Sequence, residues 1–239
     1  INIIFLKRIY KIKFFWEIIM HKTIKNLLKI NDNIKEKLLL NNNTSKSTKI
    51  IAVSKTFKID HIKPLIEYGH IHFGENKVQE AQEKWTEVKK KNSNIQLHLI
   101  GRLQTNKVKF AVKLFDFIHS LDSEKLAKKI SDEQKKINKR LKLFIQINIG
   151  SEDQKSGISS KNVYDFANYC KELDLDILGT MCIPPDDNNQ NLYFSNMQKI
   201  NSDLGYKELS MGMSNDYLNA LEFKSSFLRI GSKIFGARS

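Results

Sequence analysis

A lysine directly follows a short apolar segment early in the chain. Residues 50–53 are Ile-Ile-Ala-Val, a run typical of a strand that is buried on both faces. Lys55 lies at the end of this run, where an ammonium group is seldom found unless the protein needs it. Because desolvation disfavours its charged form, such a lysine can become the neutral amine that forms a Schiff base with an aldehyde. A lysine that merely extends from a strand end into solvent is the alternative interpretation.

Two segments near the other end of the chain are rich in serine and glycine. Residues 210–214 are Ser-Met-Gly-Met-Ser, and Gly231 and Ser232 follow another apolar run. Serine hydroxyls can donate hydrogen bonds to an anion, and glycines let backbone N–H groups approach it closely. Ser232 is also placed to begin a short helix whose N-terminal dipole favours negative charge. These segments predict a phosphate site, and two turns that only reverse the chain are the alternative.

Short apolar runs and amphipathic segments alternate along most of the chain. Strands are predicted at 50–54, 71–73, 96–100, 116–119, 142–148, 176–182, 206–210 and 226–230. Helices are predicted at 21–40, 59–68, 76–91, 105–114, 123–139, 160–173, 190–203 and 214–222, with a polar loop at 41–45. This alternation implies an α/β fold with a parallel sheet, and it fits a single (β/α)8 barrel of the TIM type with an N-terminal helix. A doubly wound open sheet is the alternative, but the first strand is not followed by G-x-G-x-x-G, and the sequence contains no P-loop.

A barrel of this kind would bring distant residues to one site. Side chains that do chemistry in such barrels follow the carboxyl ends of the strands. Lys55 follows the first predicted strand, Asn76 follows the second, and the serine-glycine segments follow the seventh and eighth. An amine and an anion site across one barrel mouth suit a ligand that carries both an aldehyde and a phosphate. Pyridoxal 5′-phosphate (PLP) fits that description.

Length and composition fit a soluble globular protein with one large α/β domain or two small ones. The chain has 239 residues, of which 41% are hydrophobic and 28% charged. Cys170 and Cys182 are too few for a disulfide framework and lack metal-ligand spacing, so we expect a reducing, cytoplasmic location. The net charge of +14 comes almost entirely from lysine, whereas base readout favours arginine. We therefore expect a solvated basic surface with no specific nucleic-acid partner, and weak binding to polyanions is the alternative.

Residues 1–19 differ in pattern from the remainder of the chain. Lysine and arginine residues interrupt their apolar residues, which argues against a membrane span or a secretory segment. Met20 stands just before the first predicted helix, so we interpret 1–19 as an upstream extension, and we expect the barrel domain to span 20–239. A basic amphipathic anchor or an organellar presequence is the alternative.

Six motifs in order resemble those of a known family. They are Ala-Val-Ser-Lys-Thr at 52–56, Phe-Gly-Glu-Asn within 73–80, His-Leu-Ile-Gly and Leu-Gln-Thr-Asn-Lys within 98–107, Gln-Ile-Asn-Ile and Lys-Ser-Gly within 146–157, and the segments 210–214 and 229–238. Together they resemble the pyridoxal-phosphate homeostasis protein family from about residue 20 to the end. The resemblance implies a barrel similar to the barrel domain of fold-type III enzymes such as alanine racemase. Arg102 departs from the family pattern at the barrel mouth, and its role stays open.

The resemblance also implies roles for individual residues. Lys55 matches the lysine that holds PLP as an internal aldimine, Arg229 matches the arginine that faces the pyridine nitrogen, and Asn76 matches a residue near the ring. The implied cofactor-binding residues are Lys55, Asn76, Ser210, Met211, Gly212, Ser214, Arg229, Gly231 and Ser232, with no catalytic residue and no metal ligand. A structural role at the barrel rim is the alternative for each of these positions and for His98.

Arg229 limits the chemistry that a bound cofactor could support. A guanidinium keeps its proton in proteins, so it can only donate to the pyridine nitrogen, which then stays unprotonated. A neutral pyridine is a weak electron sink, which hinders transamination and decarboxylation but not simple exchange of the Schiff base. We therefore expect a PLP-binding protein rather than an enzyme, which buffers or delivers the cofactor in vitamin B6 homeostasis. Apo-enzymes that depend on PLP are the expected recipients, and the protein is expected to be a monomer.

An amino-acid racemase of the alanine racemase type is the alternative function. In those racemases a second, β-rich domain supplies a tyrosine base, and we expect no such domain after the eighth strand-helix unit. A carrier should show an absorbance band that amines discharge, whereas a racemase should interconvert the forms of alanine. A nucleic-acid binder should instead bind with salt-dependent affinity, and Lys55→Ala should leave that affinity unchanged.

Three other features of the sequence are expected to have structural rather than functional roles. His70 and His72 would face the same way on a short strand, but the absence of a third ligand at suitable spacing argues against a metal site. The charged helix predicted at 76–91 is expected to be a solvated outer helix. Cys182, near a strand end, is expected to be a small buried hydrophobe.

Overall fold

The computed structural model describes residues 20–40, 48–152 and 154–237. The predicted extension at 1–19 and the predicted polar loop at 41–45 lie outside these ranges, so the domain boundary at residue 20 stays a prediction. Within the described ranges, none of the helices combines the length and the apolar character that crossing a membrane requires.

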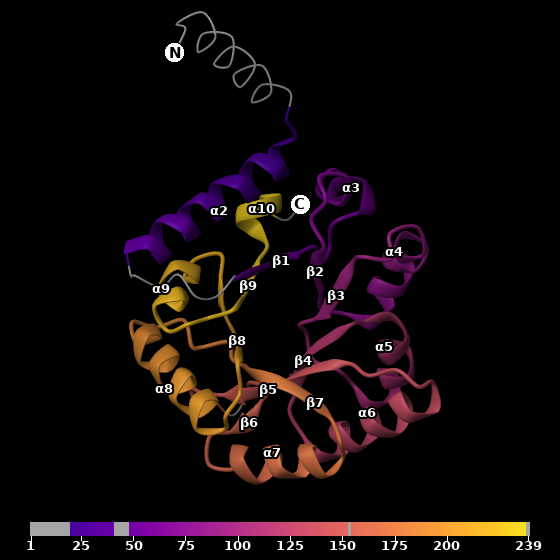
Figure 1. Ribbon diagram of the computed structural model, residues 1–239, viewed down its shortest axis with the longest axis vertical. Helices are drawn as coiled ribbons and strands as arrows, with labels where there is room; N and C mark the ends of the chain where they lie inside the picture. The colour runs from indigo at the N-terminus through magenta and orange to yellow at the C-terminus, as the bar shows by residue number, and fades with distance from the viewer. Residues whose placement is uncertain (1–19, 41–47, 153, 238–239) are drawn as a thin grey trace, which may run out of the picture.

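In the described part of the chain, eight parallel strands form a closed ring (Figure 1). They are β1 (Lys49–Val53), β2 (His72–Glu75), β3 (Gln96–Leu99), β4 (Phe117–Leu121), β5 (Lys142–Asn148), β7 (Asp176–Met181), β8 (Glu208–Met213) and β9 (Phe227–Ile230). Strand β4 pairs with β5, and β1 pairs with β9, which closes the ring. The short strand β6 (Ile158–Ser159), which was not predicted, pairs with the end of β5. The predicted (β/α)8 barrel is confirmed.

Helices connect the strands and cover the outside of the ring. They are α2 (Lys22–Leu40), α3 (Ile59–Glu67), α4 (Val78–Lys91), a 3-10 turn (Thr105–Lys107) that leads into α5 (Val108–Leu114), α6 (Glu124–Lys136), α7 (Val163–Glu172), α8 (Gln190–Asp203), α9 (Tyr217–Glu222) and α10 (Ser232–Phe235). The predicted N-terminal helix is α2, which lies outside the ring beside α9 and α10 (Figure 1). Its Leu27, Ile30 and Ile34 are buried and share one helix face.

Apolar side chains cover both faces of the strands. Ile50 and Ala52 of β1 face outward into the large core between the strands and the helices. Ile51 faces the opposite way and belongs to a second cluster, which also contains Phe117 and Phe227. Because both faces are covered, β1 is apolar from Ile50 to Val53, which explains why the sequence pattern located it. Other strands, such as β3 with His98 and β4 with His119, carry buried polar residues among the apolar ones.

Strand β8 is longer than predicted. The sequence suggested a strand at 206–210 followed by a loop, but the strand continues to Met213. The pairing of β8 with β9 shifts between Ser210 and Met213, and Gly212 has a φ of +88° there. A glycine in the left-handed region allows such a β-bulge. The Ser-Met-Gly-Met-Ser segment is therefore mostly a bulged strand end, and only Ser214 belongs to the loop.

Candidate functional site

The ends of β1 and β9 lie side by side at the carboxyl end of the barrel. In their parallel pairing, Ala52 is opposite Ile230. Gly231 is the next residue, and a Cβ added to it would lie 3.4 Å from the Cβ and the carbonyl oxygen of Val53. Lys55 follows two residues after Val53 and is half-buried. The backbone at Lys55 therefore lies near the start of the loop at Gly231, and a shared site of the Lys55 amine and this loop stays a prediction.

The turn that carries Lys55 is clamped by helix α4. Thr56 has a φ of +69°, which is unusual for a β-branched residue. Its N–H donates a hydrogen bond to Oε1 of Glu80 at 2.6 Å, and Nζ of Lys84 donates to the carbonyl of Ser54 at 2.9 Å. The residues on both sides of Lys55 are thus tied to α4, which fixes the backbone from which the amine extends.

A buried ion pair supports this clamp. Nζ of Lys84 lies 2.9 Å from Oε1 of Glu75 and 3.0 Å from Oε1 of Glu80, and the side chains of Lys84 and Glu75 are 8% and 0% exposed. The same Glu75 oxygen accepts hydrogen bonds from Ser54 and Trp85. Burial raises the pKa of Glu75, although Lys84, Trp85 and Ser54 act in the opposite direction. Helix α4 is an outer helix, as expected, but its Lys84 is buried against the barrel and is not solvated.

The loops after β8 and β9 meet at the same barrel end. Oγ of Ser214 accepts a hydrogen bond from the N–H of Lys233 at 3.4 Å, and α10 begins at Ser232, as predicted. A cavity of about 420 Å³ borders this loop, and its lining includes Ser214 and Lys155. The two segments predicted to form a phosphate site thus lie together and next to β1.

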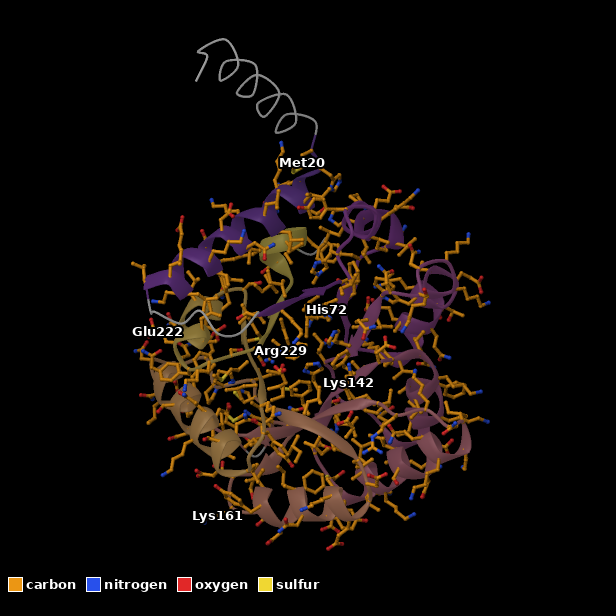
Figure 2. All side chains as sticks on the ribbon, in the orientation of Figure 1. Met20, His72, Lys142, Lys161, Glu222 and Arg229 are labelled. Carbon is orange, nitrogen blue, oxygen red and sulfur yellow. The ribbon has the colours of Figure 1, made fainter. Side chains whose placement is uncertain are left out.

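Arg229 lies inside the ring of strands (Figure 2). Its Nη1 donates to Oγ of Ser210 and its Nη2 to the carbonyl of Cys182, both at 2.7 Å, and the residue is 4% exposed. Burial lowers the pKa of Arg229, but a guanidinium keeps its charge in proteins. Cys182 is buried, as predicted, and burial raises the pKa of its thiol to about 12. Arg229 thus places a buried cation beneath the barrel mouth.

Ser210 takes part in a chain of hydrogen bonds that crosses the barrel interior. Its Oγ lies 2.9 Å from Nδ1 of His119. Nε2 of His119 lies 2.9 Å from Nδ1 of His98, and Nε2 of His98 lies 3.0 Å from Nδ1 of His72. His98 is therefore not a rim residue, as the alternative interpretation held, but is fully buried in the ring. Ser210 likewise faces the interior and contacts Arg229.

Asn76 directly follows β2 and is half-buried. The end of β3 packs closely against it, because a Cβ added to Gly101 would lie 2.4 Å from the carbonyl oxygen of Asn76. Arg102 is the next residue and is exposed. Burial raises the pKa of Asp122, and the charge of Arg102 acts against this rise. Arg102 thus influences Asp122 at the barrel mouth.

Comparisons with known proteins agree with this geometry. A family model described as the N-terminal domain of alanine racemase matches residues 26–239. A pyridoxal phosphate homeostasis protein of Pasteurella multocida is 35% identical over 225 residues, which cover 90% of this chain and 97% of that protein. The chain belongs to the pyridoxal phosphate homeostasis protein family. A family member from Escherichia coli K12 is 32% identical over 229 residues, which cover 92% of this chain and 98% of that protein.

Solved structures that are similar to this chain contain the same barrel. PipY of Synechococcus elongatus, without PLP, matches with a TM-score of 0.76 at 31% identity, over 85% of this chain and 100% of that chain. PipY with PLP bound matches with a TM-score of 0.70 at 29% identity, over the same shares of the two chains. An alanine racemase of Clostridium difficile matches with a TM-score of 0.65 at 17% identity, over 89% of this chain and 56% of that chain. The likeness to the racemase is one of fold alone.

The structure brings most of the predicted site residues of this family member together. Lys55, Asn76, Ser214, Gly231 and Ser232 all follow strand ends at the barrel mouth, and Ser210 and Arg229 lie beneath it. Met211 differs, because its side chain packs in the outer core. Gly212 shapes the bulge that separates the inward Ser210 from the loop. The cofactor contacts of these residues stay a prediction.

Sequence reasoning missed several residues that support the site. His119, Glu75 and Lys84 were not singled out, and His72 was considered only as a metal ligand. A histidine within an apolar strand is a signal in itself, because a buried imidazole needs hydrogen-bond partners. Nε2 of His70 donates to the carbonyl of His72 at 2.9 Å. In the described ranges, no three His, Cys, Asp or Glu side chains are grouped so that they could hold a metal ion.

Proposed function

We propose that this protein binds PLP, holds it as a Schiff base on Lys55, and takes part in intracellular vitamin B6 homeostasis. In this role it buffers the reactive aldehyde and delivers the cofactor to PLP-dependent apo-enzymes. The observation that carries the proposal is the juxtaposition of Lys55 with the loop that begins at Gly231, above the buried Arg229. The names of the curated relatives and the PLP-bound structure of PipY support the choice of ligand.

The residues at the mouth suit the polar parts of PLP. Lys55 would hold the aldehyde carbon, while backbone N–H groups at Gly231 and Ser232 and the hydroxyl of Ser214 would bind the phosphate. Arg229 would donate to the pyridine nitrogen, since its guanidinium has more N–H groups than the two that bind Ser210 and Cys182. The bound cofactor supplies an electrophilic aldehyde that can be exchanged between amines.

The remaining predicted residues would act through these groups. We assign Ser210 to Arg229, which it contacts, rather than to the phosphate. Met211 and Gly212 would shape the strand end that carries Ser214, and Asn76 would border the cofactor ring.

The partner of the pyridine nitrogen favours holding the cofactor over turnover. Because Arg229 can only donate a proton in a hydrogen bond, the pyridine nitrogen would stay neutral and would withdraw electrons weakly. Exchange of the Schiff base does not depend on that withdrawal. We therefore propose a cytoplasmic, monomeric PLP-binding protein without robust enzymatic turnover.

Borohydride reduction tests the site directly. Protein saturated with PLP is expected to show a visible absorption band that borohydride removes, and mass spectrometry should find the reduced adduct on Lys55. Lys55→Ala should lack the band, whereas Lys58→Ala, which changes an exposed lysine on the same loop, should retain it. An adduct on any other residue, or a band that persists in Lys55→Ala, would show that the site assignment is wrong.

The same preparation separates a carrier from an amino-acid racemase. A carrier should release its PLP to added amines and should form no D-alanine from L-alanine in a coupled assay. Sustained interconversion of alanine, lost in Lys55→Ala, would instead support the racemase.

A further inference from the structure

A continuous hydrogen-bonded chain links Arg229 of β9 to His72 of β2 through the barrel interior. It passes from Arg229 to Ser210, His119, His98 and His72 with successive distances of 2.7, 2.9, 2.9 and 3.0 Å. Figure 2 labels its two ends, His72 and Arg229, within the ring of strands. We call His72, His98, His119 and Ser210 the histidine relay.

The buried hydroxyl of Ser210 determines the direction of the relay, that is, which group donates and which accepts in each of its hydrogen bonds. Arg229 can only donate, so Oγ of Ser210 accepts its hydrogen bond. In the part of the chain that the structure describes, the other side-chain partner of this oxygen is Nδ1 of His119. The hydroxyl must then donate to His119, because its hydrogen would otherwise be buried without an acceptor.

The direction continues through the imidazoles. His119 accepts at Nδ1, so its proton lies on Nε2 and is donated to Nδ1 of His98. By the same reasoning His98 donates from Nε2 to Nδ1 of His72. Each ring is neutral and turns its acceptor nitrogen toward Arg229. Burial lowers the pKa of His98 and of His119 well below the usual value, and the positive charge of Arg229 adds to this effect at His119.

Aromatic neighbours hold the two inner rings in place. His98 stacks on Phe117 with ring centroids 4.2 Å apart, and His119 stacks on Phe144 at 4.3 Å. Both stacks are nearly parallel, with interplanar angles of 15° and 10°. The relay is therefore restrained by packing as well as by its hydrogen bonds.

The far end of the relay lies within the electrostatic influence of two lysines, Lys49 and Lys142. His72 is half-buried, and burial, His70, Lys49 and Lys142 together lower its pKa to about 4. Lys49 also lies 3.8 Å from Glu208, which partly balances its charge. These groups oppose protonation of His72, so the relay keeps its direction at neutral pH.

We propose that the histidine relay positions Arg229 for the pyridine ring, an inference that rests on the proposed binding of PLP. The hydrogen-bond acceptors of the buried guanidinium, Oγ of Ser210 and the carbonyl oxygen of Cys182, are neutral. The aligned dipoles behind Ser210 stabilise its charge, as does the negative charge of Asp216, which acts against the lowering of the pKa of Arg229 by burial. Arg229 is thereby held in place before the ligand arrives, and binding need not reorganise it. The three histidines are positioning residues, since they act through Ser210 and Arg229.

Nitrogen NMR of histidine in the cofactor-free protein tests the direction of the relay. The rings of His72, His98 and His119, assigned with single His→Phe variants, are expected to be neutral and protonated at Nε2. They should stay so from about pH 8 to about pH 5, well below the range in which free imidazoles titrate. A ring of His98 or His119 that is protonated at Nδ1 or doubly protonated at neutral pH would overturn the inference.

Binding measurements test the link to the cofactor site. His119→Phe keeps the ring stack but removes the acceptor for Ser210, and it is expected to weaken PLP binding about tenfold. His119→Asn offers an acceptor oxygen near the position of Nδ1 and should stay within about threefold of the wild type. The visible band of bound PLP should become pH-dependent in His119→Phe only, because a loosely held Arg229 would let the pyridine nitrogen take up a proton.

Thr180→Val is the matched control. It removes the buried hydrogen bond from Oγ1 of Thr180 to Asn201, at 2.9 Å, outside the ring. It should lower stability and leave both PLP affinity and the pH profile unchanged. The inference is refuted if Thr180→Val weakens binding as much as His119→Phe does, or if His119→Phe binds like the wild type.

The two measurements separate this inference from the proposed function. A wild-type protein that binds no PLP would refute the proposed function and the role of the relay in it, while the NMR result would still decide the direction of the relay. A wild-type protein that binds PLP on Lys55 but is insensitive to His119→Phe would refute the relay alone.

Discussion

Gly212 occupies a position in β8 that only glycine can fill without movement of the chain. Its φ of +88° is strained for other residues, and a Cβ there would lie 2.6 Å from the Cβ of Ala220. Before the bulge at this residue Ser210 contacts Arg229, and after it Ser214 belongs to the loop at the mouth. Gly212 therefore lies between Ser210, on the pyridine side of the proposed site, and Ser214, on its phosphate side.

Replacing Gly212 by alanine should lower the free energy of unfolding more than the same replacement at a glycine that also has a positive φ but has open space around it. Gly212→Ala is expected to lower the free energy of unfolding by about 2–4 kcal/mol, because backbone strain and overpacking add. Gly205→Ala is the control, with a φ of +72° and no atom within 4 Å of the added Cβ, and it should cost only about 1 kcal/mol. Urea denaturation measures both. Equal decreases in the free energy of unfolding for the two variants would mean that Ala220 moves away from the added Cβ without loss of stability.

Helix α4 contributes to the proposed site through the residues that it ties to β1. Lys84 and Glu80 hold the carbonyl of Ser54 and the N–H of Thr56, on either side of Lys55. Lys84 also neutralises Glu75, whose carboxylate is fully buried. The helix thus restrains the turn that carries the amine.

Breaking this ion pair should destabilise the barrel strongly. Lys84→Met leaves a buried carboxylate without its cation and is expected to lower the free energy of unfolding by about 3–5 kcal/mol. The double variant Glu75→Gln/Lys84→Met removes the charge of the carboxylate as well and should recover most of that stability. Lys90→Met is the control, because Lys90 and Glu87 form a pair that is 67% and 73% exposed, and it should cost less than about 0.5 kcal/mol. Chemical denaturation of the variants gives the values. If the double variant is as unstable as Lys84→Met, the loss of stability comes from altered packing and not from the unpaired charge of Glu75.

The barrel and most of the residues at its mouth could be predicted because each strand, and the residues that follow it, can be recognised from a short stretch of sequence. Strands covered on both faces are rich in apolar residues, as β1 is, and residues after parallel strands must share one end of the barrel. This reasoning located Lys55 and Gly231 on neighbouring strand ends. It failed at β8, where a glycine that makes a bulge resembles a glycine that makes a turn.

The supporting contacts could not be predicted because they join side chains on different elements. Lys84 resembles a solvated helix residue until the end of β2 places Glu75 against it. His98 and His119 look like isolated polar residues until the register of β3 and β4 makes them neighbours. Sequence spacing defines which face of a strand a residue occupies, but not which residue of the next strand lies opposite.

The barrel as a whole buries neutral histidines that an unfolded chain would protonate. Burial, above all, lowers the pKa of His70 and of His72 from 6.5 to about 4, and lowers that of His98 and His119 well below 6.5. Below pH 6.5 the unfolded state therefore binds more protons than the folded state. Their contribution to stability is present above the unfolded pKa and is lost as the pH falls toward the folded pKa.

Stability should accordingly fall as the pH is lowered from 6.5 to about 4. Each such histidine adds a slope of up to about 1.4 kcal/mol per pH unit over its window. Urea denaturation as a function of pH measures the total slope, and His72→Phe should make it shallower. A stability that is constant over this range, or that rises on acidification, would contradict the burial of these rings as neutral groups.

The pairing of β1 with β9 joins the beginning and the end of the barrel sequence. During synthesis on the ribosome, Lys55 emerges well before β9 and the loop at Gly231, which follow every other strand of the barrel. The amine and its proposed anion site can therefore meet only after the last strand of the barrel has emerged. A polypeptide that is cut short before β9 would contain Lys55 but lack the proposed anion site, and we expect it not to retain PLP.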